Sequence, residues 1–425
     1  MGTTASDRPE PVASRRCVAR VPVLMSERTC TMTSPHGKTG APALGSLVGV
    51  GLVVMLAGCG GGGNAEASKS SPSTAVSAAD VASRFGTEYQ KTGTGPMVDA
   101  TVPQTPSGKT EMGDKRGNVR TFRLTAGEFS QKIANFPVKT MRVWGYNGST
   151  PGPTLVAYEG EQVRVIVKNE LGSSRPDEGL PVKKNATTVH FHGMHQPNED
   201  DGVAGISQPE PIPVGGSFTY EFKPGHVGTF AYHSHTDSAV QELRGLDGFF
   251  IILPRKERKS VHVDRDYAMT LQQFDPKGPS GLVDVFPEGT GDFPFSTVNG
   301  KTGDAAGGPL TIKKGDRVRI RVYNASNLSH SMHLHGMDSI LTAKNGHAVP
   351  PVRETTQNVA PGDFFDLEFT ADNPGNWIFH CHVPHHTGNA KMSGYNGAPV
   401  GMTRIFHYDG YRAVPKQYFA FNGKP

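Results

Sequence analysis

The chain has 425 residues, a formal net charge of +4 and 19% charged residues. This length allows two or three domains with hydrophobic cores. The nearly balanced charge excludes the strongly basic composition of a nucleic-acid-binding protein. Its 52 glycines and 33 prolines, together with many valines, threonines and phenylalanines, favour an all-β protein with many turns.

Residues 1–58 have the features of an export segment. A short basic stretch after Met32 leads into an apolar run, 43–56, which is too short and glycine-rich for a comfortable membrane span. The run ends in Leu-Ala-Gly-Cys59, which resembles the lipobox of bacterial lipoprotein signal peptides. By that resemblance Cys59 becomes the lipidated first residue of the mature protein. The alternative is an uncleaved anchor, and both place the remaining chain outside the cytoplasmic membrane on a lipid surface.

The composition changes near residue 118. Residues 59–117 are rich in Gly, Ser, Ala and Pro, which predicts a flexible tether. Beyond it, short runs of β-forming residues alternate with turns such as Asn147-Gly148. No stretch has the length and the 3.6-residue period of a substantial helix. The predicted strands include 121–125, 139–146, 162–168 and 248–253.

One cysteine belongs to the folded region. Cys17 and Cys30 lie in the export segment and Cys59 is the residue expected to be lipidated, so Cys381 has no partner for an internal disulfide. In a strand, side chains alternate between faces, so His380 and His382 should face one way and Cys381 the other. His386 can return to the thiolate side, and Met392 could follow it. A thiolate, two imidazoles and a weak thioether are the ligands of a blue-copper site.

Two halves of the folded region share a pattern of paired histidines. The offset between the halves is 143 for the first pair (190 to 333) and 147 for the second (233 to 380), which indicates an internal duplication. The four pairs are His190-Phe-His192, His233-Ser-His235, His333-Leu-His335 and His380-Cys-His382. Eight imidazoles can hold a cluster of several metals if the four strands converge. Ser234 aligns with Cys381, Thr187 with His330 and Ala239 with His386, so the second copy alone carries the thiolate site.

In the order and spacing of these motifs, residues 118–410 resemble the multicopper oxidases. The resemblance implies two cupredoxin-like Greek-key β-barrel domains, 118–256 and 257–425, with a type 1 copper in the second and a trinuclear cluster between domains. It implies about four coppers per protomer. The implied ligands are His330, Cys381 and His386 for type 1, His190 and His333 for type 2, and His192, His233, His235, His335, His380 and His382 for type 3. Where family members with an axial methionine usually have it, this chain has Lys391. Met392 follows, and it is either the axial ligand or a packing residue.

The number of residues between the two pairs of histidine motifs limits the number of domains and indicates how the chains assemble. Between His235 and His330 there are 94 residues, too few for a third complete domain. The resemblance is therefore to the two-domain, small-laccase type, in which the trinuclear cluster forms between neighbouring chains of a homotrimer. The sequence alone also permits a cluster within one chain.

The resemblance implies an oxidase in which a reductant gives single electrons to the type 1 copper through the exposed edge of His386 or His330. The electrons then pass along Cys381 to the cluster, where dioxygen is reduced to water. Asp201 matches an acidic residue that the family uses near the cluster and is the predicted proton-handling residue. The alternative for Asp201 is a solvated Asp-Gly turn. His195 and His385 are predicted to lie beside ligands or on the surface, and His226 and His347 carry no signal.

Three functions fit these motifs to different degrees. They are a laccase-like oxidation of phenols or similar reductants, a metallo-oxidase reaction on cuprous, ferrous or manganous ions, and copper-dependent nitrite reduction. The 13 methionines are scattered, which does not favour cuprous ions. Nitrite reductases of this resemblance carry their thiolate site in the first domain, so Ser234 and the four complete histidine pairs argue against that reaction.

Overall fold

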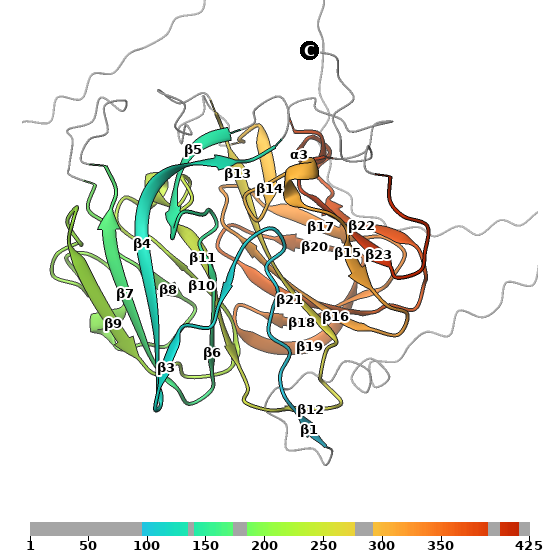
Figure 1. Ribbon diagram of the computed structural model, residues 1–425, viewed down its shortest axis with the longest axis horizontal. Coiled ribbons are helices and arrows are strands. Elements are labelled where there is room, and N and C mark those ends of the chain that lie inside the picture. Colours follow the sequence, from blue (N-terminus) through green and yellow to red (C-terminus); the bar gives the residue numbers. More distant parts are fainter. Residues whose placement is uncertain (1–95, 135–139, 173–184, 277–291, 390–399, 416–425) are drawn as a thin grey trace, which may run out of the picture. The chain divides into compact units, whose positions relative to one another are not determined.

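The computed structural model describes residues 96–134, 140–172, 185–276, 292–389 and 400–415, all within one compact unit, Ser73–Pro425. Strands dominate this part of the chain and form two cupredoxin-type domains, which confirms the predicted all-β class (Figure 1). The described helices are single short turns: η1 (Asn198–Asp200), α2 (Ser238–Gln241), η3 (Gly303–Ala306) and α3 (Pro384–Gly388). None of the described helices has the length and apolar character needed to span a membrane.

Domain 1 is a sandwich of two sheets. The first has the order β2-β6-β11-β10-β8, formed by β2 (Thr110–Glu111), β6 (Thr154–Tyr158), β11 (Asp247–Leu253), β10 (Gly228–His233) and β8 (His190–His192). The second has the order β3-β4-β7-β9, with β5 paired to β4, and is formed by β3 (Asp114–Arg116), β4 (Val119–Lys132), β7 (Gln162–Glu170), β9 (Ser217–Phe222) and β5 (Thr140–Tyr146). In β7, Val163, Val165 and Val167 are buried, whereas Arg164 is partly exposed and Lys168 is exposed. This alternation builds the core between the sheets.

Domain 2 repeats the arrangement. One sheet has the order β14-β13-β16-β21-β18-β19, formed by β14 (Phe295–Val298), β13 (Arg265–Phe274), β16 (Arg317–Asn324), β21 (Phe364–Thr370), β18 (Ser339–Lys344) and β19 (His347–Glu354). The other has the order β15-β23-β22-β17-β20, formed by β15 (Leu310–Ile312), β23 (Thr403–Tyr408), β22 (Asn376–Cys381), β17 (His330–Leu334) and β20 (Thr356–Val359). Ile320 and Leu367 of the first sheet share one buried cluster with Met332 and Phe379 of the second.

Strand pairing confirms the internal duplication. The parallel pair β4–β7 corresponds to β13–β16, and the parallel pair β6–β11 corresponds to β15–β23. The antiparallel pair β8–β10, which carries His190 and His233, corresponds to β17–β22, which carries His333 and His380. Each pair of histidine motifs therefore sits on neighbouring strands at the same place in both domains.

The predicted tether is wrong over residues 96–117. Strand β1 (Met97–Val98) pairs with β12 (Glu257–Arg258), while β2 and β3 join the sheets of domain 1. Gln104 forms a bridge to Tyr267 of domain 2. This stretch has few large apolar residues because backbone ladders, rather than core burial, hold it in place. The rest of the predicted tether, and Cys59, lie outside the described residues.

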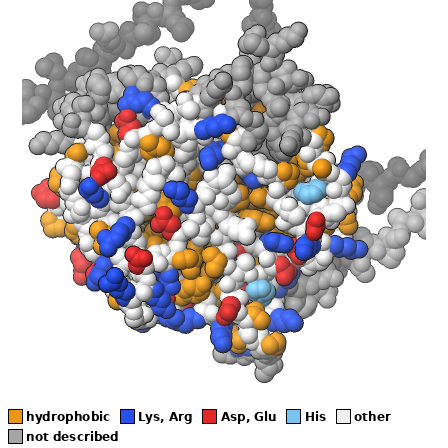
Figure 2. Space-filling view, viewed as in Figure 1, with side chains coloured by type: hydrophobic (Ala, Val, Ile, Leu, Met, Phe, Trp, Pro, Cys, Tyr) orange, Lys and Arg blue, Asp and Glu red, His pale blue; other side chains and the backbone are white. Residues whose placement is uncertain are grey.

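Charged side chains are mixed over the surface. Figure 2 shows Lys and Arg interspersed with Asp and Glu across the described part of this face. On the sheet of domain 1, Arg164 pairs with Glu221, and Lys168 pairs with Glu170. Exposed pairs of this kind contribute little to stability, about 0–1 kcal/mol each.

A buried polar network joins the two domains. The Thr229 hydroxyl on β10 donates to Asp366 Oδ1 on β21 (2.6 Å), and Arg321 Nη1 on β16 donates to Thr229 Oγ1 (2.5 Å). Arg321 also pairs with Asp266 (2.8 Å), and it is 1% exposed. The contacts place the β16–β21 sheet of domain 2 against β10 of domain 1.

Candidate metal centres

Three predicted ligands converge in the core of domain 2. Cys381 Sγ lies 3.7 Å from His330 Nδ1 and 3.5 Å from His386 Nδ1, and the two nitrogens are 3.1 Å apart. Cys381 and His330 come from the buried faces of β22 and β17, whereas His386 comes from α3. All three are buried, with His386 only 2% exposed. The set is compact enough to hold one metal ion.

The hydrogen bonds around this set leave the converging nitrogens free to bind a metal. His330 Nε2 lies 2.6 Å from Ser326 Oγ, and His386 Nε2 lies 3.2 Å from Asp292 Oδ1. When Nε2 carries the proton for these bonds, Nδ1 presents its lone pair to the site. Burial, with the nearby His386, lowers the pKa of His330 to about 3, so the ring is neutral. Burial raises the pKa of the Cys381 thiol, so a bound cation is needed to stabilise the thiolate.

The structure corrects the predicted route of electron entry. Neither His330, at 0% exposure, nor His386, at 2%, offers an exposed ring edge. Asp292 and His385 cover His386 instead, and sequence reasoning missed Asp292. Hydrophobic periodicity could not have found it, because its contact with His386 spans 94 positions and depends on the tertiary fold. Met392 lies outside the described residues.

The four histidines of domain 1 form the first half set: His190, His192, His233 and His235. His192 Nδ1 lies 3.3 Å from His233 Nε2, and the centroid of the His190 ring lies 5.3–5.8 Å from those of the other three. Asp201 supports this set, because its backbone oxygen lies 2.9 Å from His190 Nδ1 and its Oδ1 lies 3.2 Å away. His190 Nε2 is thereby left available as a ligand atom.

A second carboxylate supports the first half set. Glu242 Oε1 lies 3.2 Å from His233 Nδ1, opposite the nitrogen that faces His192. Burial opposes the charged imidazole, but Glu242 outweighs it and the pKa of His233 is raised. Burial, with the neighbouring His233 and His190, lowers the pKa of His192 to about 4. Sequence reasoning missed Glu242, which follows α2 and matches no ligand position of the second copy.

The histidines of domain 2 form the second half set: His333, His335, His380 and His382. His333 and His380 are partners across β17 and β22, and His335 Nε2 lies 3.0 Å from His380 Nε2. Both strands alternate: Met332 and Phe379 face the core, and His333 and His380 face the other way. The prediction that Cys381 and its flanking histidines face opposite sides is confirmed for His380, which is partly exposed beside the buried Cys381.

The two half sets are separate within the chain. Among the described histidines, ring contacts and hydrogen bonds join members of each half set but never one half set to the other. His192 instead packs against Phe364 of β21 at a centroid distance of 5.7 Å. His333 and His380 lie on the other sheet of domain 2, on the face turned away from β21. A cluster of eight imidazoles within one chain is not formed.

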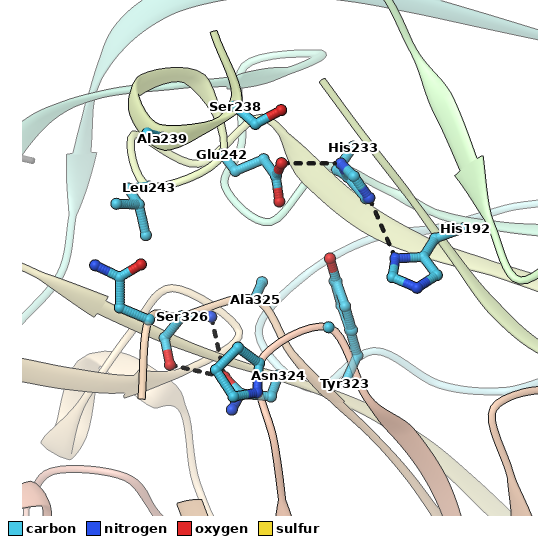
Figure 3. Close-up of a pocket in the computed structure, with 13 residues that line it drawn as sticks. His192, His233, Ser238, Ala239, Glu242, Leu243, Tyr323, Asn324, Ala325 and Ser326 are labelled. Atoms are coloured by element: carbon cyan, nitrogen blue, oxygen red, sulfur yellow. Dashed lines mark hydrogen bonds and ion pairs between the residues drawn. The ribbon is translucent and has the colours of Figure 1, made fainter. Parts of the chain in front are cut away.

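A pocket of about 310 Å³ opens beside the first half set. Figure 3 shows Glu242, His233 and His192 along one side of it and Tyr323, Asn324 and Ser326 of domain 2 along the other. Ser326 is the residue that contacts His330. The pocket thus lies between His192 and His233 on one side and the loop that supports the thiolate site on the other.

The sequence suggested that His226 and His347 are isolated, but the structure shows that they are in contact with each other. His226 stacks on His347 with ring centroids 4.6 Å apart, and His195 lies 6.0 Å from His226. His195 and His226 lie on loops of domain 1 and His347 begins β19 of domain 2, and the sequence pattern could not bring these segments together. They form no compact three-ligand group among the described residues.

Comparison with known proteins agrees with the geometry. Two multicopper oxidase family models match the chain, at residues 129–257 and 273–398. The solved structure of the multicopper oxidase mgLAC is 31% identical, with a TM-score of 0.59, and the match covers 71% of this chain and 93% of that one. The blue copper oxidase of Nitrosomonas europaea is 27% identical, with a TM-score of 0.56 and the same coverage of both chains.

The curated relatives are longer proteins. Laccase-2 of Podospora anserina is 28% identical over 304 residues, which cover 67% of this chain and 46% of that protein. The chain thus spans less than half the length of the first curated relatives that it matches. The copper nitrite reductase of Nitrosomonas europaea, at 20% identity and a TM-score of 0.55, shares the fold. Taken with the two family models and the structural match that covers 93% of mgLAC, these findings show that the chain belongs to the multicopper oxidase family.

Proposed function

We propose that this protein is a copper-dependent oxidase that takes single electrons from a laccase-like organic reductant and uses dioxygen as the acceptor. The observation that carries the proposal is the buried convergence of Cys381 Sγ with the Nδ1 atoms of His330 and His386. This donor set is that of a blue-copper site. When bound, copper supplies one-electron chemistry at this site and the reduction of dioxygen at the histidine half sets.

The chain's residues divide between these two tasks. His330, Cys381 and His386 would hold the type 1 copper, with Met392 proposed as the axial ligand. His190 and His333 would hold type 2, and His192, His233, His235, His335, His380 and His382 would hold the type 3 pair. Peptide bonds join Cys381 directly to His380 and His382. A covalent path therefore leads from the thiolate site to the opposite face of β22.

We propose that the cluster is completed by a second copy of the chain, in a homotrimer. Within one chain the two half sets make no ring contact or hydrogen bond with each other, so each would need the complementary half set of a neighbour. A head-to-tail contact of this kind must close into a ring to satisfy every copy. The ring of three follows from the resemblance to small laccases.

Mixing two inactive variants tests this assembly. His190→Ala removes a ligand from the first half set, and His333→Ala removes one from the second. Mixed oligomers should regain oxidase activity, because some contacts then join two intact half sets. If co-assembly gives no recovery, while the two variants separately keep the wild-type mass in solution, the shared cluster is disproved.

Asp201 is our candidate for proton handling during dioxygen reduction. Its backbone oxygen and carboxylate both lie within 3.2 Å of His190 Nδ1, and Gln196 Nε2 donates to its Oδ1 (2.8 Å). The Asp201→Asn variant should keep its blue colour and its rate of reduction by substrate but reoxidise more slowly in dioxygen. Unchanged turnover would rule out the proton role.

Two other reactions are the alternatives. Oxidation of cuprous, ferrous or manganous ions would use the same centres and differ only in the reductant. Nitrite reduction would need one catalytic copper in place of a cluster, and the thiolate position of domain 1 is occupied by Ser234. Rates with phenols, ferrous ion and nitrite under matched conditions separate the three.

We also propose that residues 1–58 direct export and that lipidation of Cys59 attaches the protein to a membrane surface outside the cytoplasm. The supporting feature is the sequence Leu-Ala-Gly-Cys59 after an apolar run. Cys59→Ala should abolish incorporation of a radioactive fatty acid and release the protein from the membrane fraction. Continued labelling would contradict the proposal.

The central test is made on the copper-loaded full chain in detergent. About four coppers per protomer, an intense blue band and dioxygen uptake coupled to a phenolic reductant are expected. About two coppers with no paired-copper signature would overturn the oxidase.

A further inference from the structure

The thiolate site is covered by a carboxylate–imidazole pair. Asp292 Oδ2 lies 2.5 Å from His385 Nε2, and Asp292 Oδ1 lies 3.2 Å from His386 Nε2, so one carboxylate accepts from both rings. The two ring centroids are 4.4 Å apart. The side chain of His385 is 61% exposed and that of Asp292 is 27% exposed, whereas that of His386 is 2% exposed. Solvent therefore reaches this end of the site through Asp292 and His385.

Asp292 and His385 are therefore the groups that a reductant contacts first when it approaches this side of the thiolate site. A reductant that stops at His385 is one ring contact away from His386, whose Nδ1 faces Cys381 Sγ. The Asp292 carboxylate also places a negative charge at the point of approach. Charge at such a point attracts reductants of opposite sign and repels those of like sign.

We propose that Asp292 and His385 form the docking point for the reductant and that Asp292 selects reductants with positive charge. A hydrated ferrous or manganous ion and a cationic aromatic amine share this chemistry. The inference rests on the proposed oxidase, because it needs an oxidised thiolate site as electron acceptor. The step is outer-sphere: the reductant loses one electron to that site, and no bond forms or breaks.

Two inert complexes of opposite charge test the selection without oxidase turnover. Copper-loaded full-length protein is mixed anaerobically with hexaammineruthenium(II), a cation, or hexacyanoferrate(II), an anion, and bleaching of the blue band is timed. Asp292→Asn should lower the ratio of the cation rate to the anion rate by about fivefold at low ionic strength. The difference should shrink at high salt. Because a changed reduction potential alters both rates through the site itself, the ratio isolates the charge effect.

Asp409→Asn is the matched control, since Asp409 is an exposed carboxylate of the same domain that contacts none of the candidate ligands. It should leave the ratio unchanged. His385→Gln keeps the carboxylate but removes the exposed ring, and it should slow both complexes by a similar factor. The charge selection would be overturned if the ratio of the two rates in Asp292→Asn equalled that of wild type or of the control. Unchanged rates in His385→Gln would show that His385 is not part of the docking point.

Two natural types of reductant are then compared in steady state. A loss of kcat/KM in Asp292→Asn for ferrous ion alone would assign the site to metal ions, and a loss for a cationic amine alone would assign it to organic cations. No loss for either would count against the proposal. Absence of a blue band in the wild type would be a failure of the proposed function instead, so the two failures are distinguishable.

Discussion

The same position in the two domains holds a metal-binding set in one and a hydrogen-bonded cluster in the other. Where domain 2 brings Cys381, His330 and His386 together, domain 1 has Ser234 and Thr187. Their hydroxyls lie 2.5 Å and 2.7 Å from Gln241 Oε1. Gln241 is fully buried, and its amide nitrogen donates to the Ala186 carbonyl (2.8 Å). The duplicated fold therefore accommodates either the Cys/His set or the hydrogen-bonded Ser/Thr/Gln cluster at this position, provided that every buried polar group has a partner.

Cys381→Ser makes domain 2 resemble domain 1 at this position and should have the largest effect. A serine hydroxyl does not replace a thiolate as a ligand for this site. We expect loss of the blue band and of oxidase activity, with about three of about four coppers retained. Metal analysis and optical spectra check this. Ser234→Cys is the matched control, and it should give no blue band because Thr187 and Gln241 supply no imidazole.

A second comparison concerns one strand position that is exposed in domain 1 and buried in domain 2. Arg164 on β7 and Arg319 on β16 occupy equivalent places after the same turn. Arg164 pairs with Glu221 in solvent, with side-chain exposures of 42% and 44%. Arg319 is 1% exposed and pairs with Asp266 at 3.2 Å and Glu368 at 2.9 Å. The difference arises because this face of β16 is covered by β12 and domain 1, whereas that of β7 is open.

Replacing each arginine by methionine measures that difference. Arg319→Met removes one cation from the buried network, in which Asp266 keeps Arg321 and Glu368 keeps Arg317, and should lower the free energy of unfolding by about 3 kcal/mol. Arg164→Met should lower it by at most about 1 kcal/mol. Denaturant unfolding of both variants provides the test. Equal losses would show that the buried network is no more important than an exposed pair.

The hydrogen-bonded cluster of domain 1 should matter for stability and not for colour. Gln241→Leu removes the donor to the Ala186 carbonyl and the shortest hydrogen bond of each of the Ser234 and Thr187 hydroxyls, which keep longer ones to each other and to the backbone. We expect a loss of about 2–3 kcal/mol in the free energy of unfolding. The blue band should be unchanged, because the thiolate site lies in the other domain. A weakened blue band at full copper loading would show that the two pockets are coupled.

The sequence predicted what depends on alternation along a strand. Paired histidines two positions apart must share a face, and a cysteine between them must face away, so the grouping around Cys381 could be read before any coordinates. Contacts between distant segments could not. Asp292 and Glu242 reach ligands from loops that carry no periodic signal. The separation of the two half sets depends on which sheet of domain 2 packs against domain 1, and no local pattern encodes that packing.

A carboxylate occupies the same turn in both domains, and in domain 1 it makes the free energy of unfolding depend on pH. Glu161 accepts from the Tyr158 backbone amide, and Asp316 accepts from that of Lys313 in the equivalent turn. Burial opposes ionisation, but hydrogen bonds from Arg120, Tyr158 and Lys115 outweigh it and lower the pKa of Glu161 from 4.5 to about 2. Since the folded-state pKa is depressed, the stabilisation is complete above pH 4.5 and is lost as the pH falls towards 2.

Unfolding free energies measured across this pH range should therefore fall more steeply for wild type than for Glu161→Gln. The expected difference is roughly 2 kcal/mol after allowance for solvent screening. Asp316→Asn is the comparison in domain 2, where the side chain is 14% exposed and pairs with Arg265 at 3.1 Å. A wild-type slope no steeper than that of Glu161→Gln would mean that other carboxylates dominate acid unfolding. If the free energy of unfolding falls with pH as steeply in Asp316→Asn as in Glu161→Gln, the carboxylates of both turns contribute equally to acid unfolding, despite the deeper burial of Glu161.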